Sequence, residues 1–141
     1  MRTYSGIINE LPYKGVFVYG ANVEGRHGAG AAKVAKDKFG AEYGKVGWVG
    51  QSYGIITKDL RAKKHPSITS VNIMNQIKKL YDTASLNLDK EFYVAYSGSG
   101  RNLNGYSNLE MAKMFAQWKI PDNLVFEEGF AELIKDIQEK K

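Results

Sequence analysis

Two glycine-rich segments of this sequence combine a flexible backbone with side chains that can bind anions. The first, GANVEGRHGAGAA (residues 20–32), follows a short apolar run and leads into an alanine-rich stretch, and the second is SGSGRNLNGYS (residues 97–107). Glycine lets an anion approach the backbone closely, and the start of a helix offers unpaired N–H groups and a partial positive charge. The two segments therefore predict a phosphate site. Their pairing favours a diphosphate, because each segment can face one side of it.

Polar side chains in these segments indicate what surrounds the phosphate. Asn22 either contacts the ligand or shapes the turn, since asparagine tolerates turn geometry. His27 is a candidate general acid or base, because an unperturbed imidazole has a pKa of about 6.5; a surface or capping role is the alternative. Arg26 and Arg101 can hold phosphate oxygens through two N–H groups each, or can be ordinary exposed arginines.

Other kinds of site fit the sequence less well. The glycines of the first segment run G-x-x-G-x-G, unlike the dinucleotide pattern G-x-G-x-x-G, and Arg26 and His27 stand where a P-loop has Lys and Ser/Thr. Glu24 and Asp59 could act as carboxylate bases, but isolated acidic residues are usually solvated. No cysteine is present and the two histidines, His27 and His65, stand at unrelated places, so we expect no metal site and no cofactor.

Strands and helices alternate along the chain in a way that brings both segments to one edge of a sheet. Strands are predicted at residues 15–20, 52–59, 91–98 and 123–128, and an edge strand within residues 4–11. Helices are predicted at residues 28–39, 70–84, 107–118 and 130–140. Such alternation predicts right-handed crossovers and a three-layer α/β/α fold with a mixed, mainly parallel central sheet. Ligands of these sheets bind at the carboxyl ends of the strands, which both segments follow.

Length and composition indicate one ordinary globular unit. The chain of 141 residues has no linker or repeat, so residues 1–141 are predicted to form a single domain. No apolar run approaches the length of a membrane span and no secretory signal is visible, so we expect a cytoplasmic protein without a membrane partner. The formal charge of +5 comes mostly from lysine. A solvated lysine-rich surface explains this charge better than nucleic-acid binding does. The oligomeric state is left open.

Together the two segments resemble the ligand loops of macrodomains, the family that binds ADP-ribose. GANVEGRHGAGAAKVA resembles the first loop, in which an asparagine after a buried strand is followed by a glycine triplet that opens an Ala/Val-rich helix. SGSGRNLNGYSNLEMAKMFA resembles the second, in which a Ser/Thr-Gly pair leads to Gly-aromatic and a helix. The resemblance spans roughly residues 6 to 130. Within the family, the chain is most similar to small macrodomain-like proteins of bacteria and phages.

The resemblance implies a role for each matching residue. Asn22 would contact the distal ribose, and Tyr106 would stack near it. The backbone of Gly28, Ala29 and Gly30 would line one side of the diphosphate. The other side would be closed by Gly98, Ser99, Gly100 and Gly105. With the side chains already discussed, the candidate ligand-binding residues are Asn22, Gly25, Arg26, Gly28, Ala29, Gly30, Gly98, Ser99, Gly100, Arg101, Gly105 and Tyr106.

Three features depart from the family pattern. The triplet is GAG, and Ala29 fits only where φ is negative. The second loop is longer than usual, so the roles of Arg101, Asn102 and Asn104 do not transfer. The aspartate that reads adenine in many macrodomains has no clear match, although Asn9 or Glu10 lies near the expected place.

The resemblance implies a function with alternatives. We expect binding of ADP-ribose or a related nucleotide diphosphate, with hydrolysis of an ADP-ribose derivative of the ADP-ribose 1''-phosphate phosphatase or ADP-ribosyl hydrolase type. Asn22 would position the ribose or water, and His27 would assist proton transfer. One alternative is a binding module that captures a nucleotide signal without chemistry. The other is a nucleic-acid-binding protein.

Overall fold

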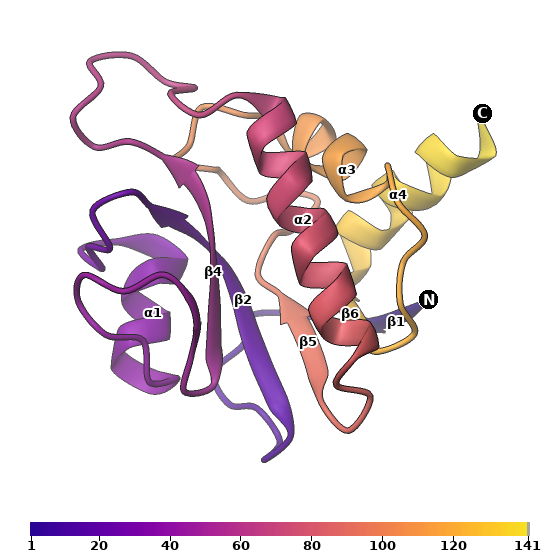
Figure 1. Cartoon of the computed structure of the whole chain (residues 1–141). Coiled ribbons are helices and arrows are strands. Elements are labelled where there is room, and N and C mark those ends of the chain that lie inside the picture. The colour runs from indigo at the N-terminus through magenta and orange to yellow at the C-terminus, as the bar shows by residue number, and fades with distance from the viewer. Residues whose placement is uncertain (141) are drawn as a thin grey trace.

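The computed structural model describes residues 1–140 and shows a six-stranded sheet with helices on both faces (Figure 1). The strands are β1 (Arg2–Tyr4), β2 (Gly15–Asn22), β3 (Gly47–Val49), β4 (Ser52–Lys58), β5 (Glu91–Val94) and β6 (Leu124–Glu127). The helices are α1 (Gly30–Lys38), α2 (Ser70–Ser85), α3 (Asn108–Phe115) and α4 (Glu128–Glu139). The predicted three-layer α/β fold is confirmed.

The strands lie in the order β1-β6-β5-β2-β4-β3 across the sheet. Every neighbouring pair is parallel except β3 with β4, so the sheet is mixed and mainly parallel, as predicted. β2 lies between β4 and β5, because the chain leaves β2 toward one side and later returns on its other side. At such a reversal the connections diverge and leave a crevice at the carboxyl ends of the strands.

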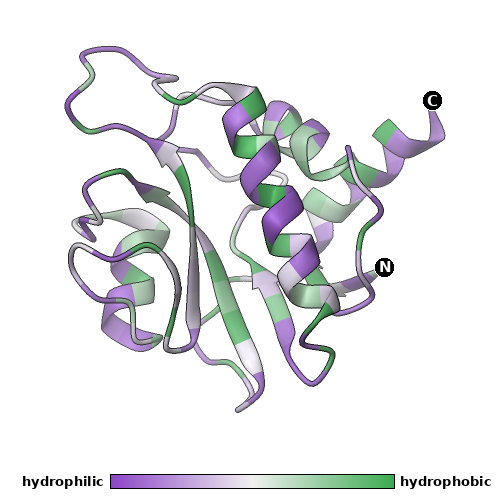
Figure 2. Cartoon of the chain, viewed as in Figure 1, coloured by the Kyte–Doolittle hydropathy of each residue, from purple (hydrophilic) through white to green (hydrophobic). Residues whose placement is uncertain are grey.

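The apolar run of β2 is buried on both faces, which is why it shows no alternation with polar residues. Phe17, Tyr19 and Ala21 pack against α1 on one face. Val16 and Val18 point the other way, into the larger core that α2, α3 and α4 cover. Because neighbouring side chains of a strand point to opposite faces, one sequence run supplies both cores. Figure 2 shows this run as a largely hydrophobic central ribbon.

The helices present the faces that their residue spacing predicted. The buried residues of α2 are Ile73, Ile77, Leu80, Tyr81 and Ala84, which recur at intervals of three and four. The predicted capping box of α3 is present, since Ser107 accepts from the Glu110 backbone N–H while the Glu110 carboxylate accepts from that of Ser107. The backbone N–H groups of Ser107 and Glu110 are therefore satisfied within the chain.

Several boundaries differ from the sequence-based expectation. The edge strand is β1, at residues 2–4 rather than within 4–11, and it pairs with β6. The short antiparallel strand β3 was not predicted, because it has three residues, one of them Gly47, and Gly50 follows directly. Helix α3 ends at Phe115, before Trp118. Within residues 1–140, no helix is both long and apolar enough to cross a membrane.

Candidate functional site

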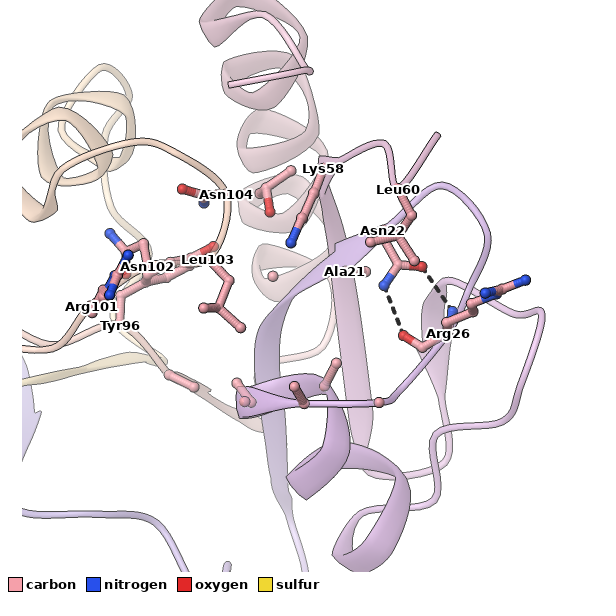
Figure 3. Close-up of a pocket in the computed structure, with 18 residues that line it drawn as sticks. Ala21, Asn22, Arg26, Lys58, Leu60, Tyr96, Arg101, Asn102, Leu103 and Asn104 are labelled. Carbon is pink, nitrogen blue, oxygen red and sulfur yellow. Dashed lines mark hydrogen bonds between the residues drawn. The ribbon is translucent and has the colours of Figure 1, made fainter. Parts of the chain in front are cut away.

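A cavity of about 380 Å³ opens at the carboxyl ends of β2, β4 and β5 (Figure 3). We call it the strand-end cavity. One wall is the segment 28–32 that begins α1, and another is the segment 101–104 that follows β5. The lining is completed by Gly20, Ala21, Asn22, Arg26, Thr57, Lys58, Leu60, Ala95 and Tyr96. The structure therefore brings parts of both glycine-rich segments to one cavity, as their positions after strands predicted.

The first wall is the uncapped start of α1. The N-cap residue Ala29 makes no side-chain capping hydrogen bond, and no acidic residue occupies the first turn. Ala29 has φ −157°, the negative value that its place in the GAG triplet required. Gly30 has φ +60°, a left-handed conformation that favours glycine. The first N–H groups of α1 thus belong to residues that line the cavity and have no capping side chain, and a helix start of this kind favours an anion.

Three cationic residues contribute to the cavity lining, and the Arg26 guanidinium extends away from the cavity in Figure 3. Arg26 follows β2, Lys58 ends β4, and Arg101 lies on the second wall. Within residues 1–140, none of the three forms an ion pair, and no Asp or Glu lines the cavity. Figure 3 shows the Lys58 amine directed into the cavity between the two walls. The electrostatics of the cavity therefore favour a ligand with several negative charges.

Asn22 lines the cavity, and its amide also holds the first loop in shape. Its Oδ1 accepts from the Arg26 backbone N–H, and its Nδ2 donates to the Arg26 carbonyl, both at 2.8 Å. These two bonds close the turn that leads from β2 toward α1. An amide nitrogen has two protons, so one N–H of Asn22 is left for a ligand. Asn22 therefore shapes the turn, which is one of the two roles that the sequence left open for it.

The acidic residues near the cavity are engaged by an arginine. Arg61 forms ion pairs with Asp59 at 3.0 Å and with Glu24 at 3.3 Å. Hydrogen bonds from Arg61 lower the pKa of Asp59 to about 2. Glu24 also accepts from the Leu60 backbone N–H at 3.0 Å. Neither carboxylate lines the cavity. Glu24 joins the loop after β2 to the loop after β4, whereas Asp59 binds Arg61 within its own loop.

His27 lies behind the cavity wall rather than on it. Its side chain is buried, with 8% of its surface exposed, and its Nε2 lies 3.3 Å from the Tyr19 hydroxyl. Burial, with a smaller contribution from Lys36, lowers the pKa of His27. His27 does not line the cavity. Gly25 is likewise outside it, because its left-handed turn packs against the backbone of Gly44.

At the start of the second glycine-rich segment, the Gly98 backbone N–H binds a carboxylate of the protein itself, that of Glu127. Glu127 accepts from the backbone N–H groups of Gly98 at 2.8 Å, Gly129 at 2.9 Å and Phe130 at 3.0 Å. Gly98 lies so close to α4 that an added Cβ would be 2.7 Å from the Gly129 carbonyl carbon. Gly98, Ser99 and Gly100 do not line the cavity. The N–H of Gly98, expected to meet a phosphate, thus meets Glu127 instead.

The second half of that segment is tied to the loop after β4. An added Cβ at Gly105 would lie 2.6 Å from the Pro66 nitrogen, and the Tyr106 hydroxyl donates to the Ile68 carbonyl at 2.5 Å. Neither Gly105 nor Tyr106 lines the cavity. Their contacts join the two loops and leave residues 101–104 between them as the cavity wall.

Several lining residues were not among the candidates from the sequence. Thr57 lies near the end of β4 and Tyr96 follows β5, so the rule that ligands meet the carboxyl ends of strands could have found them. Asn104 is almost fully buried at 4% exposure. No local pattern marks it, because its burial results from contacts made by the folded loop.

Comparison of the sequence with protein-family models and with curated proteins identifies no relative. The chain matches no protein-family model, and no curated protein matches its sequence. The resemblance of its two loops to those of macrodomains therefore stays a prediction.

Proposed function

We propose that this protein binds a nucleotide diphosphate of the ADP-ribose type in the strand-end cavity. The observation that carries the proposal is a cavity lining that has no acidic residue within residues 1–140 and that combines the uncapped start of α1 with the inward-directed Lys58 amine and with residues Arg26 and Arg101. A diphosphate supplies two negative charges to such a place. The cavity volume of about 380 Å³ lies within the range of about 300–1,000 Å³ that is common for small-molecule sites.

The position of the cavity and the macrodomain-like loops also support this ligand class. Glycine-rich turns that lead from a strand into a helix are a recurrent way to bind phosphate through backbone N–H groups. One departure from the family pattern is accommodated, since Ala29 has a negative φ and the left-handed place is taken by Gly30. The proposal assigns the diphosphate to the wall formed by residues 28–32.

Isothermal titration calorimetry tests the proposal directly. We expect ADP-ribose to bind the wild-type protein, and Arg101→Ala to bind it about tenfold or more weakly, because a hydrogen bond to a charged group contributes about 1.5–3 kcal/mol. Lys135→Ala is the matched control, since Lys135 lies on α4 and not on the cavity. Absence of binding at millimolar ADP-ribose, or equal affinity of both variants, would contradict the proposal.

Hydrolysis of an ADP-ribose derivative is the second candidate function. Its support is the place of Asn22, which lines the cavity together with the cationic Lys58. A cation there can stabilise negative charge that develops in a reaction. Among the residues that the structure describes, no imidazole or carboxylate side chain lines the cavity, so the proton transfer predicted for His27 has no geometric support. Incubation with ADP-ribose 1''-phosphate and with ADP-ribosylated protein tests this candidate. Binding without product formation would leave a capture module.

A further inference from the structure

Two carboxylates lie next to residues that line the strand-end cavity, where their charge opposes an anionic ligand. Glu24 belongs to the loop after β2, and Asp59 stands between the lining residues Lys58 and Leu60. A carboxylate near a bound anion lowers the affinity of the site, because like charges repel. The contacts of Glu24 indicate a positioning role that offsets this repulsion.

Glu24 joins the loop after β2 to the loop after β4 at two points. Its Oε1 accepts from the Leu60 backbone N–H at 3.0 Å, and its Oε2 lies 3.3 Å from the Arg61 Nε. Within residues 1–140, the buried Oε2 has no hydrogen-bond partner, so its charge is compensated by the Arg61 guanidinium. Both loops contribute to the cavity wall, through Arg26 and Leu60. A change at position 24 therefore breaks a link between two parts of that wall.

Asp59 holds the Arg61 side chain in the place where Glu24 meets it. The Arg61 Nε donates to the Asp59 Oδ1 at 3.1 Å, and its Nη2 donates to the Oδ2 at 3.0 Å. The Arg61 backbone N–H donates to the same Oδ1 at 3.0 Å. A guanidinium held at two atoms by one carboxylate has a defined orientation. Arg61 is thus a link of fixed geometry between Glu24 and the loop after β4.

The segment that Glu24 holds begins directly after Lys58. The Lys58 carbonyl accepts from the Val23 backbone N–H at 2.9 Å. Strand pairing is irregular here, because the register between β2 and β4 shifts between Ala21 and Asn22. The Val23 bond and the two contacts of Glu24 therefore fix the backbone where β4 ends. The Lys58 side chain extends from this backbone into the cavity (Figure 3), so the place of its amine depends on these contacts.

We propose that Glu24 is a positioning residue of the strand-end cavity. Through Leu60 and Arg61 it holds the segment that carries Lys58, and it thereby raises the affinity for a diphosphate although its own charge opposes one. This inference rests on the proposed diphosphate binding. A purely electrostatic role has the opposite sign, because the loss of a negative charge alone strengthens anion binding.

Calorimetric titration with ADP-ribose separates the two roles in a pair of variants that lose the same charge. Glu24→Ala removes both contacts and is expected to bind ADP-ribose about three- to tenfold more weakly than the wild type. Glu24→Gln keeps an oxygen that can accept from the Leu60 N–H, so its affinity is expected to lie between those of Glu24→Ala and the wild type. The matched control is Glu42→Ala, which removes an exposed carboxylate that pairs with Lys45 at 3.2 Å. It is expected to bind as the wild type does.

A double-mutant cycle with Lys58→Gln tests whether Glu24 acts through Lys58. Two changes that act through one group are not additive. In protein that carries Lys58→Gln, the further change Glu24→Ala is therefore expected to alter the ADP-ribose affinity less than about twofold. A general loss of structure would instead reduce the affinity by the same factor in both backgrounds.

Urea denaturation of the same samples establishes that each variant is folded. If Glu24→Ala does not fold, Glu24→Gln takes its place in the cycle and the same criteria apply. Binding equal to or tighter than that of the wild type, or an equal loss with and without the Lys58 amine, overturns the positioning role and leaves the proposed function intact. Failure of the wild type to bind ADP-ribose at millimolar concentration overturns both proposals.

Discussion

Gly28 and Gly30 both belong to the turn before α1, yet only one of them needs to be glycine. Gly30 has φ +60°, and a Cβ there would lie 3.3 Å from the Leu103 Cδ1. Gly28 has no such positive φ, and a Cβ there would meet no atom within 4 Å. Alanine substitution at each position therefore separates the effect of backbone conformation from that of a lost glycine.

The expected free energies of unfolding follow from these two geometries. Alanine in the left-handed region costs about 1–2 kcal/mol, so Gly30→Ala is expected to lose that amount, with a small addition from the displaced Leu103 side chain. Gly28→Ala is expected to lose nothing and to gain up to about 1 kcal/mol, because alanine restricts the unfolded chain. The two variants should thus differ by about 1–3 kcal/mol.

Urea denaturation followed by circular dichroism measures this difference, provided that both variants keep the m-value of the wild type. In a thermal melt the difference corresponds to several degrees, since 1 kcal/mol shifts the midpoint by about 2–4 °C for a chain of this size. Calorimetry with ADP-ribose on the same samples should show weaker binding for Gly30→Ala, because the first N–H groups of α1 shift. Equal stability of the two variants would refute the conformational reasoning for the GAG triplet.

Three further predictions concern charge and pH. Lys58→Gln should weaken ADP-ribose binding about tenfold and reduce the dependence of this binding on salt. The control variant Lys79→Gln, on the exposed face of α2, should change neither the affinity nor its salt dependence. Identical titrations of the two variants would contradict the charge argument. Burial raises the pKa of Glu127, but the hydrogen bonds from the backbone N–H groups of Gly129, Gly98 and Phe130 together lower it by more. The pKa of Glu127 is therefore below its ordinary value. The Glu127 carboxylate therefore stabilises the fold fully above the unfolded pKa of about 4.3, and this contribution is lost as the pH falls through the folded pKa. Glu127→Gln should lower the free energy of unfolding by about 1–2 kcal/mol at neutral pH. The free energy of unfolding in urea should also depend less on pH in acid for this variant. Burial, with a smaller effect of Lys36, lowers the pKa of His27, so its stabilising contribution is full above about pH 6.5 and is lost as the pH falls through the folded pKa. His27→Gln should reduce the loss of stability between about pH 7 and pH 5; an unchanged pH profile would show that the burial of His27 is not coupled to folding.

The fold could be predicted in outline because its main signals are local. The run GVFVYG gives a buried strand, the spacing from Ile73 to Ala84 gives the buried face of α2, and Ser107 with Glu110 marks the start of α3. Each signal depends on residues within a few positions of one another. The strands β1 and β3 were placed wrongly or missed, because three residues carry no periodicity and their pairing is decided by distant partners.

The candidate site was predictable only where residues of the chain directly follow a strand and begin a helix. Gly28, Ala29 and Gly30 line the cavity because the turn that contains them is itself the helix start. Gly98 showed the same local pattern, yet Glu127, 29 residues away, takes its N–H. Composition and spacing do not reveal such competition, since the competing carboxylate comes from another strand end.

The sequence by itself determined the alternation of strands and helices, the two glycine-rich turns and the excess of positive charge, because these depend on residue type and short-range spacing. The tertiary structure alone decided that His27 is buried beside Tyr19 and outside the cavity lining, and that Thr57 and Tyr96 meet beside Gly20. The physical reason is that a local pattern fixes where a backbone turns. The direction and burial of each side chain depend on the elements that pack against it from elsewhere in the chain.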